Sequence, residues 1–263
     1  MINVNILLIY PLQEYLPNKK VSWSYDPKND VKPLFFQRLF SKFTAFSTYA
    51  TLTILALVAV TPKKHHIDII EGDITDIDFD KKYDLVGISS FTAAAYSAYE
   101  IADEFRRRGV TVVLGGGHPS VLPEEAKQHA DSVVIGEAEI NWPKLLDDFE
   151  KGLLKPFYYQ TAVVKPEQIP IIPYIYSKKP YRRVQATRGC PYNCEFCSMP
   201  FTKYRKIFRM RPIEDVIHEI KAIPYRYFGF NDDSLTINPD YTKELFRQIK
   251  KEGINKKFLQ WVT

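Results

Sequence analysis

The sequence predicts an α/β protein in two parts, a parallel sheet covered by helices on both faces and then the strand–helix units of a partial barrel. Strand-like and helix-like runs alternate over the first 150 residues, a proline-rich stretch breaks the alternation, and strand–helix units resume after it. The length of 263 residues, with 45% hydrophobic and 25% charged residues, is enough for about two cored domains. The net charge of +5 is mild and does not by itself indicate a nucleic-acid partner.

The first part, residues 1–151, contains five runs rich in Val, Ile and Leu without polar alternation, which is typical of strands buried on both faces. These predicted strands cover residues 4–10, 66–70, 84–89, 110–114 and 132–135. Apolar residues spaced by three and four predict a helix over residues 93–108, which stops at Gly109, and a further helix is expected over 141–150, ended by Gly152. Such sheets bind ligands at the carboxyl ends of their strands, where the chain order reverses.

Residues 43–62 carry no charge, and about 20 apolar residues can span a bilayer. Ser and Thr interrupt the run, however, and its purely apolar part is only residues 54–60. We therefore expect a helix buried in a soluble domain and no transmembrane span. The N-terminal run has neither a positively charged segment nor a small-residue cleavage site, so the expected compartment is the cytoplasm.

A glycine-rich turn follows the fourth predicted strand, at a carboxyl end of the sheet. Gly115, Gly116 and Gly117 would let the backbone approach a ligand closely, although glycines also serve tight strand-to-helix turns. His118 stands next in the chain and is either a residue of a helix entrance or a ligand-binding group. We take all four as candidate cofactor-binding residues.

Residues 152–180 contain five prolines and are predicted to form an extended linker between the domains. Its aromatic residues indicate that it packs against the rest of the protein rather than hanging free. The second part then covers residues 181–263.

All three cysteines of the chain, Cys190, Cys194 and Cys197, lie within eight positions. Disulfides are rare in the cytoplasm, and thiolates at this spacing can converge on one soft metal centre. A structural zinc would need a fourth ligand, which a distant histidine could supply, and electron-transfer clusters normally use four thiolates. Three thiolates on a four-iron cluster would leave one iron open to bind a small molecule.

This motif resembles that of the radical S-adenosylmethionine enzymes, in which three cysteines are spaced four then three apart with an aromatic residue before the last. Phe196 fills the aromatic position. The resemblance implies that the three cysteines hold a [4Fe-4S] cluster whose open iron is chelated by S-adenosylmethionine, and that Phe196 lies near the adenine unless it serves only loop packing. Reductive cleavage by an external electron donor would then yield a 5′-deoxyadenosyl radical that abstracts hydrogen from an unactivated carbon.

The resemblance extends to the first part of the chain. The phrases at residues 85–89, 115–119 and 136–139 look like the Rossmann-like, cobalamin-binding-type domain that is fused to one large subgroup of these enzymes. The histidine motif Asp-x-His-x-x-Gly, which ligates cobalt in some cobalamin proteins, is absent after Tyr10, where the chain continues Pro-Leu-Gln-Glu-Tyr-Leu-Pro. Cobalamin is thus a possible cofactor without an axial histidine.

The second part reads as three strand–helix units, of which the third shows only its strand. Strands are predicted at residues 183–187, 227–230 and 258–262, and helices over 213–223, opened by Pro212, and from Asn238 and Pro239 to Lys250. Because the family's catalytic domain normally has six such units, we expect a C-terminally truncated radical SAM domain with little or no activity alone.

Three further residues are candidates for binding S-adenosylmethionine. Asp232 and Asp233 follow a predicted strand at its carboxyl end, where carboxylates would accept from the cofactor's ammonium group or merely initiate a turn. Arg188 would pair with the cofactor's carboxylate or form a structural ion pair. The segment between residues 178 and 211 contains ten basic residues and one acid, Glu195. Such a pattern attracts anions but is also typical of solvated surface.

The best interpretation is a radical enzyme that acts on a small or lipid-like substrate, with cobalamin-dependent methylation or carbon–carbon bond formation as possible outcomes. A tRNA methylthiotransferase would use the same cysteine loop with further cysteines in its N-terminal domain, but the first 189 residues contain none. A non-enzymatic zinc- or RNA-binding module is the third possibility, supported only by the basic run. The sequence does not identify a catalytic residue.

Overall fold

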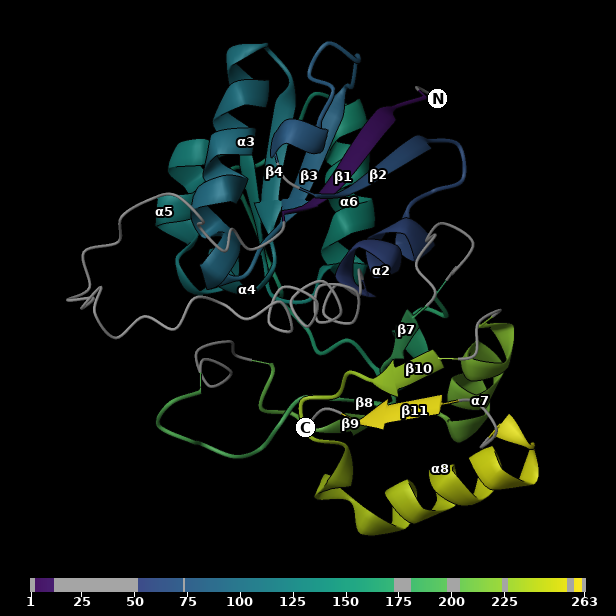
Figure 1. Ribbon diagram of the computed structural model, residues 1–263. Coiled ribbons are helices and arrows are strands. Elements are labelled where there is room, and N and C mark those ends of the chain that lie inside the picture. Colours follow the sequence, from purple (N-terminus) through teal and green to yellow (C-terminus); the bar gives the residue numbers. More distant parts are fainter. Residues whose placement is uncertain are drawn as a thin grey trace, which may run out of the picture.

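The computed structural model describes residues 3–11, 52–72, 74–172, 181–197, 204–223, 227–254 and 258–261. The first domain is a parallel six-stranded sheet in the order β2-β1-β3-β4-β5-β6 (Figure 1). Its strands are β1 (Asn5–Pro11), β2 (His66–Gly72), β3 (Leu85–Ser89), β4 (Thr111–Gly115), β5 (Ser132–Ile135) and β6 (Phe157–Tyr159). The five strands predicted for this part are confirmed to within two residues at each end.

Successive residues of the central strand β1 enter two separate cores, as expected for a strand covered on both faces. Ile6 and Leu8 pack in the core that includes α2 (Leu52–Val60) and α6 (Ala138–Glu150). Leu7 and Ile9 pack in the core that includes α3 (Ala95–Arg107). The short helices are η1 (Ile74–Asp76), η2 (Thr92–Ala94), α4 (Gly117–Val121) and α5 (Pro123–His129). The fold is therefore the doubly covered α/β sheet that the sequence predicted.

Helix α2 confirms the expected buried helix at residues 54–60. Its residues Ile54 and Val58 pack in the core beneath the sheet, while Leu55 belongs to the core of the second domain. Because both sides of α2 meet protein, the helix is apolar all round rather than amphipathic. Within the described part of the chain, no helix has the length and apolarity needed to cross a membrane.

The predicted linker 152–180 differs from the structure in one respect. Residues 157–159 form β6, which pairs in parallel with β5, so the first sheet continues past residue 151. Tyr158 is buried there, and its hydroxyl donates to Asp148 at 2.9 Å. A three-residue edge strand among prolines is too short to show a strand pattern in the sequence. The segment then passes through η3 (Pro166–Gln168) toward the second domain.

The second domain contains a parallel sheet in the order β11-β10-β7, formed by β7 (Tyr181–Val184), β10 (Tyr227–Phe230) and β11 (Phe258–Trp261). Helices α7 (Ile213–Ala222) and α8 (Pro239–Lys251) cover it, with η6 (Leu235–Ile237) before α8. The Asn238 side chain accepts from Tyr241 N at 2.9 Å, which confirms the predicted helix cap. The predicted strand 183–187 is split, since β8 (Thr187–Arg188) leaves β7 and pairs antiparallel with β9 (Arg209–Met210).

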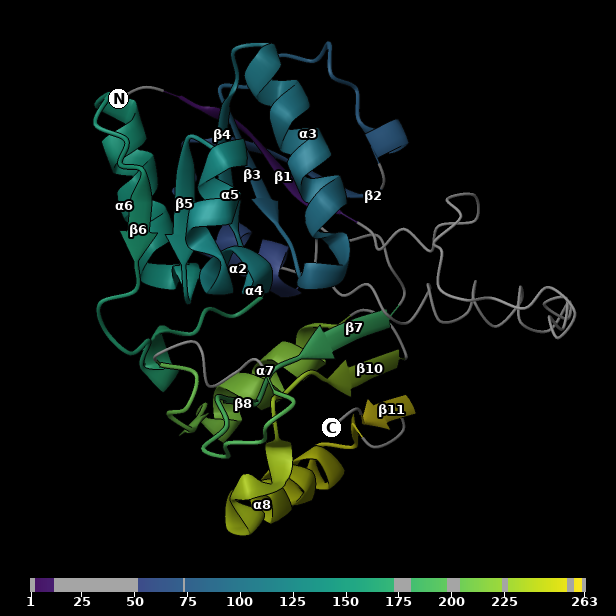
Figure 2. The same ribbon diagram turned by 90° about the vertical axis from the view of Figure 1, so that its left-hand side faces the viewer.

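The two domains lie one above the other, with the carboxyl edge of the first sheet facing the second domain (Figures 1 and 2). The turn after β5 and the start of α6 reach the β8–β9 pair, where Glu137 and Glu139 pair with Arg188 and Arg209. This edge is where the sequence placed its ligand crevice.

Candidate functional site

The cysteine loop begins at Gly189, directly after β8. Gly189 has φ +89°, and a Cβ there would collide with the carbonyl oxygens of Ile207 and Arg205. The next residue, Cys190, donates its backbone N–H to Arg205 O at 2.8 Å. Only glycine fits this close passage, so the segment 205–209, which we call the platform, fixes the start of the loop.

The three cysteines are all free thiols, and none is deeply buried. Cys190 and Cys197 are half-buried and Cys194 is exposed, while Cys197 N donates to Cys194 O at 3.0 Å and closes a turn. Across the described ranges, no three His, Cys, Asp or Glu side chains lie close enough together to hold a metal ion. The donor set fits a soft metal or cluster, and ligation requires the exposed loop to draw its thiolates together.

Phe196 is 93% exposed, so packing within the loop does not account for it. Its ring, like the Cys194 thiol, is open to a ligand that approaches the loop from solvent. Its role toward adenine stays a prediction.

Asp232 and Asp233 follow β10 and bind the start of the cysteine loop. Asp232 Oδ1 accepts from the hydroxyl of Thr187 at 2.8 Å and from its backbone N–H, and Asp233 Oδ2 accepts from Gly189 N at 2.8 Å. Asp233 Oδ1 also accepts from Arg205 at 2.9 Å, whereas Asp232 Oδ2 is buried without a hydrogen-bond partner within the described structure. Burial raises the pKa of Asp232 to about 7, although the hydrogen bonds from Thr187 oppose the rise. Of the two acids, Asp232 keeps an oxygen available for a further donor.

Arg188 is buried and already paired. Its Nη1 donates to Glu139 at 2.7 Å and its Nε donates to Gln185 at 3.0 Å. The geometry matches the structural ion pair that the sequence left open, and a role toward a cofactor carboxylate stays a prediction.

The glycine-rich turn lies at the end of β4. Gly116 has φ +96°, and a Cβ there would come within 2.7 Å of Ser89 Oγ and 2.8 Å of Ser90 O. The Nδ1 of His118 lies 3.2 Å from Thr92 Oγ1, and its Nε2 lies 3.0 Å from Tyr99 O–H. Both ring nitrogens of His118 thus have partners inside the first domain, which leaves neither free for a metal in this arrangement.

A cavity of about 560 Å³ lies between the two domains and brings many of the predicted residues together. The first domain lines it with Gly115, Gly116, Gly117 and His118, and the second with Arg188 and Asp233. The cysteines, Phe196 and Asp232 are not among its lining residues. The cavity is of the size and kind expected for a small-molecule or cofactor site.

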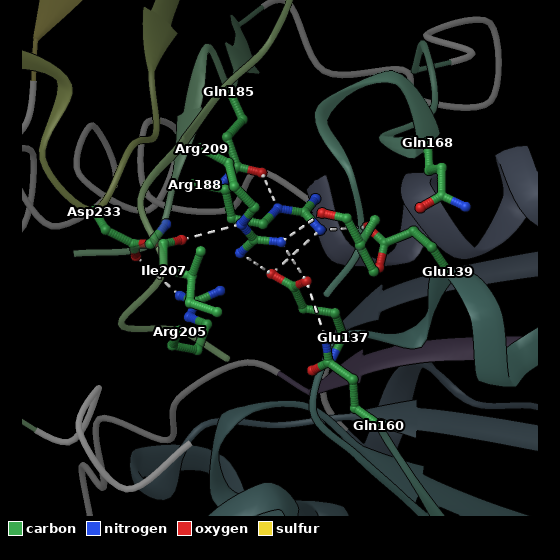
Figure 3. Close-up of polar contacts among 12 residues, drawn as sticks. Glu137, Glu139, Gln160, Gln168, Gln185, Arg188, Arg205, Ile207, Arg209 and Asp233 are labelled. Atoms are coloured by element: carbon green, nitrogen blue, oxygen red, sulfur yellow. Dashed lines mark hydrogen bonds and ion pairs between the residues drawn. The ribbon is translucent and has the colours of Figure 1, made fainter. Parts of the chain in front are cut away.

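Sequence reasoning missed an ion-pair network at this interface. Glu137, from the turn after β5, accepts two hydrogen bonds from Arg209, each 2.7 Å long, and lies 3.6 Å from Arg188 (Figure 3). Burial alone would raise the pKa of Glu137, but Arg209 and Arg188 outweigh burial and hold it below the usual value. The sequence offered two signals of this network, namely the acids at 137 and 139 after a predicted strand and the basic run between 178 and 211. It did not show which acid pairs with which base.

The fold and the site define a two-domain protein in which the carboxyl edge of a doubly covered parallel sheet faces a second domain that carries a three-cysteine loop. Family models agree with this division: a B12 binding domain matches residues 45–146, and the radical SAM superfamily matches residues 184–263. The chain belongs to the radical SAM superfamily, in the group whose members carry a B12-binding domain before the radical SAM domain.

Curated relatives include two methyltransferases of Chlorobaculum tepidum. Bacteriochlorophyllide d C-8(2)-methyltransferase is 41% identical over 187 residues, covering 66% of this chain and 41% of the relative. Bacteriochlorophyllide d C-12(1)-methyltransferase is 34% identical over 218 residues, covering 76% of this chain and 47% of the relative. The chain thus spans less than half the length of these two relatives.

Among solved structures, the radical S-adenosylmethionine methyltransferase TsrM from Kitasatospora setae matches 98% of this chain and 54% of its own with a TM-score of 0.65. That structure holds tryptophan and an S-adenosylmethionine analogue, and a second TsrM structure holds cobalamin and a [4Fe-4S] cluster. The sequence identity is 15%, so this match establishes the fold of the chain and nothing finer.

Proposed function

We propose that this chain is the cofactor-binding part of a cobalamin-dependent radical SAM methyltransferase that acts on a small organic molecule. The observation that carries the proposal is a cavity lined on one side by the glycine-rich edge of the first sheet and on the other by Arg188, which lies two residues before the first of three free cysteines. The methyltransferase names of the relatives support methyl transfer as the reaction.

The cysteine loop provides the ligands for the cluster. Thiolates of Cys190, Cys194 and Cys197 would each bind one iron and leave a fourth iron to S-adenosylmethionine. When bound, the cluster and S-adenosylmethionine would supply a 5′-deoxyadenosyl radical for hydrogen abstraction, and cobalamin would carry the methyl group. An external electron donor would reach the loop at its exposed side, where Cys194 lies.

Other residues of the chain orient the cofactors. The exposed ring of Phe196 offers a face on which adenine can stack. Within the described structure the buried Asp232 Oδ2 has no hydrogen-bond partner, and it would accept from the ammonium group. Across the cavity, Gly115 and Gly116 allow the backbone to approach a large ligand, and the arginines that line the second domain attract anionic groups.

Anaerobic reconstitution of the full chain with iron and sulfide tests the cluster. We expect a brown chromophore with about four irons per chain, the number that a four-iron cluster requires. Cys190→Ala, Cys194→Ala and Cys197→Ala should each abolish it, whereas Asn193→Ala, a change in the same loop that removes no thiolate, should retain it. A colourless zinc-containing chain, or retention of the chromophore in any cysteine variant, would refute the proposal.

Titration with hydroxocobalamin tests the second cofactor. Gly116→Leu should weaken binding because its side chain would project against Ser89 and Ser90 at the cavity wall. Gly253→Leu is the matched control, since Gly253 also has positive φ but no atom of the described residues lies within 4 Å of its added Cβ. Equal binding by the two variants would contradict a cobalamin site at this edge.

A further inference from the structure

A buried carboxylate of the first domain holds the segment against which the cysteine loop is built. Glu137 accepts from both terminal nitrogens of Arg209, at 2.7 Å each, in the two-pronged geometry that gives the strongest ion pairs (Figure 3). The side chains of both residues are only 5% exposed. Since both charges are removed from water, each depends on the other for compensation.

The first domain fixes Glu137 from behind. The residue before it, Gly136, has φ +90° and turns the chain out of β5. Gln160, which follows β6, accepts from Glu137 N at 2.9 Å and donates to Glu137 Oε2 at 3.2 Å. The carboxylate is therefore held by two adjacent strand ends rather than by a free loop.

On the other side, Arg209 belongs to the platform 205–209. Its Nε donates to Ile207 O at 3.1 Å, and its Nη1 also donates to Val164 O at 2.8 Å. The backbone of this segment carries the two carbonyls beside Gly189, and Arg205 O accepts from Cys190 N. A shift of Arg209 would thus move the residues that set the position of the first cysteine.

The pairing of β8 with β9 also connects Arg209 to β8, the strand that leads into the cysteine loop. Arg209 lies opposite Arg188 in the β8–β9 pair, and Arg188 is two residues before Cys190. Arg188 has its own acid from the first domain, Glu139, at 2.7 Å. Within the described residues, Glu137 is the carboxylate that forms an ion pair with Arg209, so its charge has no substitute there.

We propose that Glu137 is a positioning residue that fixes the platform through Arg209, and so couples the B12-type domain to the conformation of the cysteine loop. This coupling is between residues of the chain itself. It rests on the proposed function only in that the cysteine loop is taken to bind the cluster. Glu137 lines the cavity. A ligand that displaced it would therefore shift Arg209, the platform and, through the hydrogen bond from Cys190 N to Arg205 O, the first cysteine.

Hydrogen exchange on the full cofactor-free chain, followed by mass spectrometry, measures this coupling. In Glu137→Gln and Arg209→Gln the amides of residues 189 and 190 should exchange about tenfold faster, the change expected for loss of one charge-assisted hydrogen bond. Asp148→Asn is the matched control, because Asp148 is a buried acid of the same domain that pairs with Tyr158 and Lys144 away from the interface. It should leave these amides unchanged.

Two further variants separate positioning from general stability. The double variant Glu137→Gln/Arg209→Gln should exchange no faster at residues 189 and 190 than the faster single variant, because both changes break one link. Arg209→Lys keeps the charge but not the two-pronged geometry, and should recover part of the protection, which also serves if Glu137→Gln does not fold. Wild-type exchange in both Glu137→Gln and Arg209→Lys would overturn the proposal, as would acceleration spread evenly over α3 and the first sheet.

Iron content after reconstitution of the same samples distinguishes this inference from the proposed function. A wild-type chain that takes up no iron while its variants still show the local exchange effect would refute the cluster and support the positioning role. Full iron uptake without any local exchange effect would support the cluster and refute the positioning role.

Discussion

Replacing Asp232 by Asn should change how the stability of the second domain depends on pH. The carboxylate lies against β8, the strand directly before the cysteine loop. Its Oδ1 accepts from Thr187, and its Oδ2 is buried without a hydrogen-bond partner in the described structure. Burial raises the pKa of Asp232 from 3.8 to about 7, because the ionised form loses water that the hydrogen bonds from Thr187 and from the Ala186 backbone replace only in part.

The sign follows from the direction of this shift. A carboxyl whose pKa is higher in the folded state than in the unfolded state costs nothing below pH 3.8, and its cost grows until the pH passes about 7. The whole shift corresponds to about 4 kcal/mol, of which about 3 kcal/mol arises between pH 5 and pH 8. The wild-type chain should therefore lose stability over this range relative to Asp232→Asn, which has no charge to bury.

Urea unfolding of both proteins at pH 5, 6, 7 and 8 measures the effect. The difference in unfolding free energy between variant and wild type should rise with pH, whatever its absolute value, since the Asn amide carries its own unpaired group. Asp240→Asn is the control, because Asp240 is exposed on α8 and its loss should not alter the pH dependence. A difference that stays constant from pH 5 to pH 8 would show that Asp232 is ionised in the folded protein at an ordinary pKa.

Three other outcomes are expected from single substitutions, each measured by thermal or urea unfolding of the cofactor-free chain. Gly189→Ala should cost about 3 kcal/mol, because its Cβ meets the platform carbonyls at positive φ, whereas Gly253→Ala, at positive φ in open space, should cost about 1 kcal/mol; equal costs would contradict the close passage. Glu219→Ala should cost about 3–5 kcal/mol because it removes the carboxylate at 2.8 Å that compensates the buried charge of Arg211, although the hydrogen bond from Arg211 to Gln185 O remains, and a loss below about 1 kcal/mol would mean that solvent reaches the pair. Phe196→Ala should leave the melting temperature unchanged, since the ring is 93% exposed, while weakening S-adenosylmethionine binding to the reconstituted protein; a lower melting temperature would show that the ring packs in the fold.

Local patterns predicted the central strands of the first sheet well because β1, β3, β4 and β5 are buried on both faces. Such a strand is rich in Val, Ile and Leu without polar alternation, as residues 132–135 are, and the structure places β5 at these same residues. Strand β6 lacks that signal because it is three residues long and lies at the sheet edge, so its proline-rich surroundings dominated the prediction. Strand β7 was placed too late along the chain, because two of its four residues are arginines and it shows no apolar run, and the chain leaves the sheet after Val184 to form β8.

At the candidate site, sequence reasoning found residues whose chemistry is visible in their spacing. Three cysteines within eight positions indicate a metal centre, and the glycines after β4 indicate a ligand-binding turn because they follow a predicted strand. The partner of each charged residue is not visible in this way. Arg188 and Arg209 are 49 and 72 residues from the glutamates they bind, and the sequence gives no means of matching them.

The arrangement of charges at the interface explains why Arg188 is difficult to assign from its position alone. An arginine that binds a cofactor carboxylate must keep its guanidinium free, yet an unpaired guanidinium buried beside the cysteine loop would be costly in the cofactor-free chain. Glu139 and Gln185 remove that cost, and they do so from the first domain and from the second domain respectively. A carboxylate ligand at this place would have to displace Glu139, so binding there would loosen the contact between the domains, whereas binding at Asp232 would not. We therefore predict that Asp232, rather than Arg188, meets an incoming cofactor without disturbing the interface, and hydrogen exchange of α6 upon addition of S-adenosylmethionine tests this prediction.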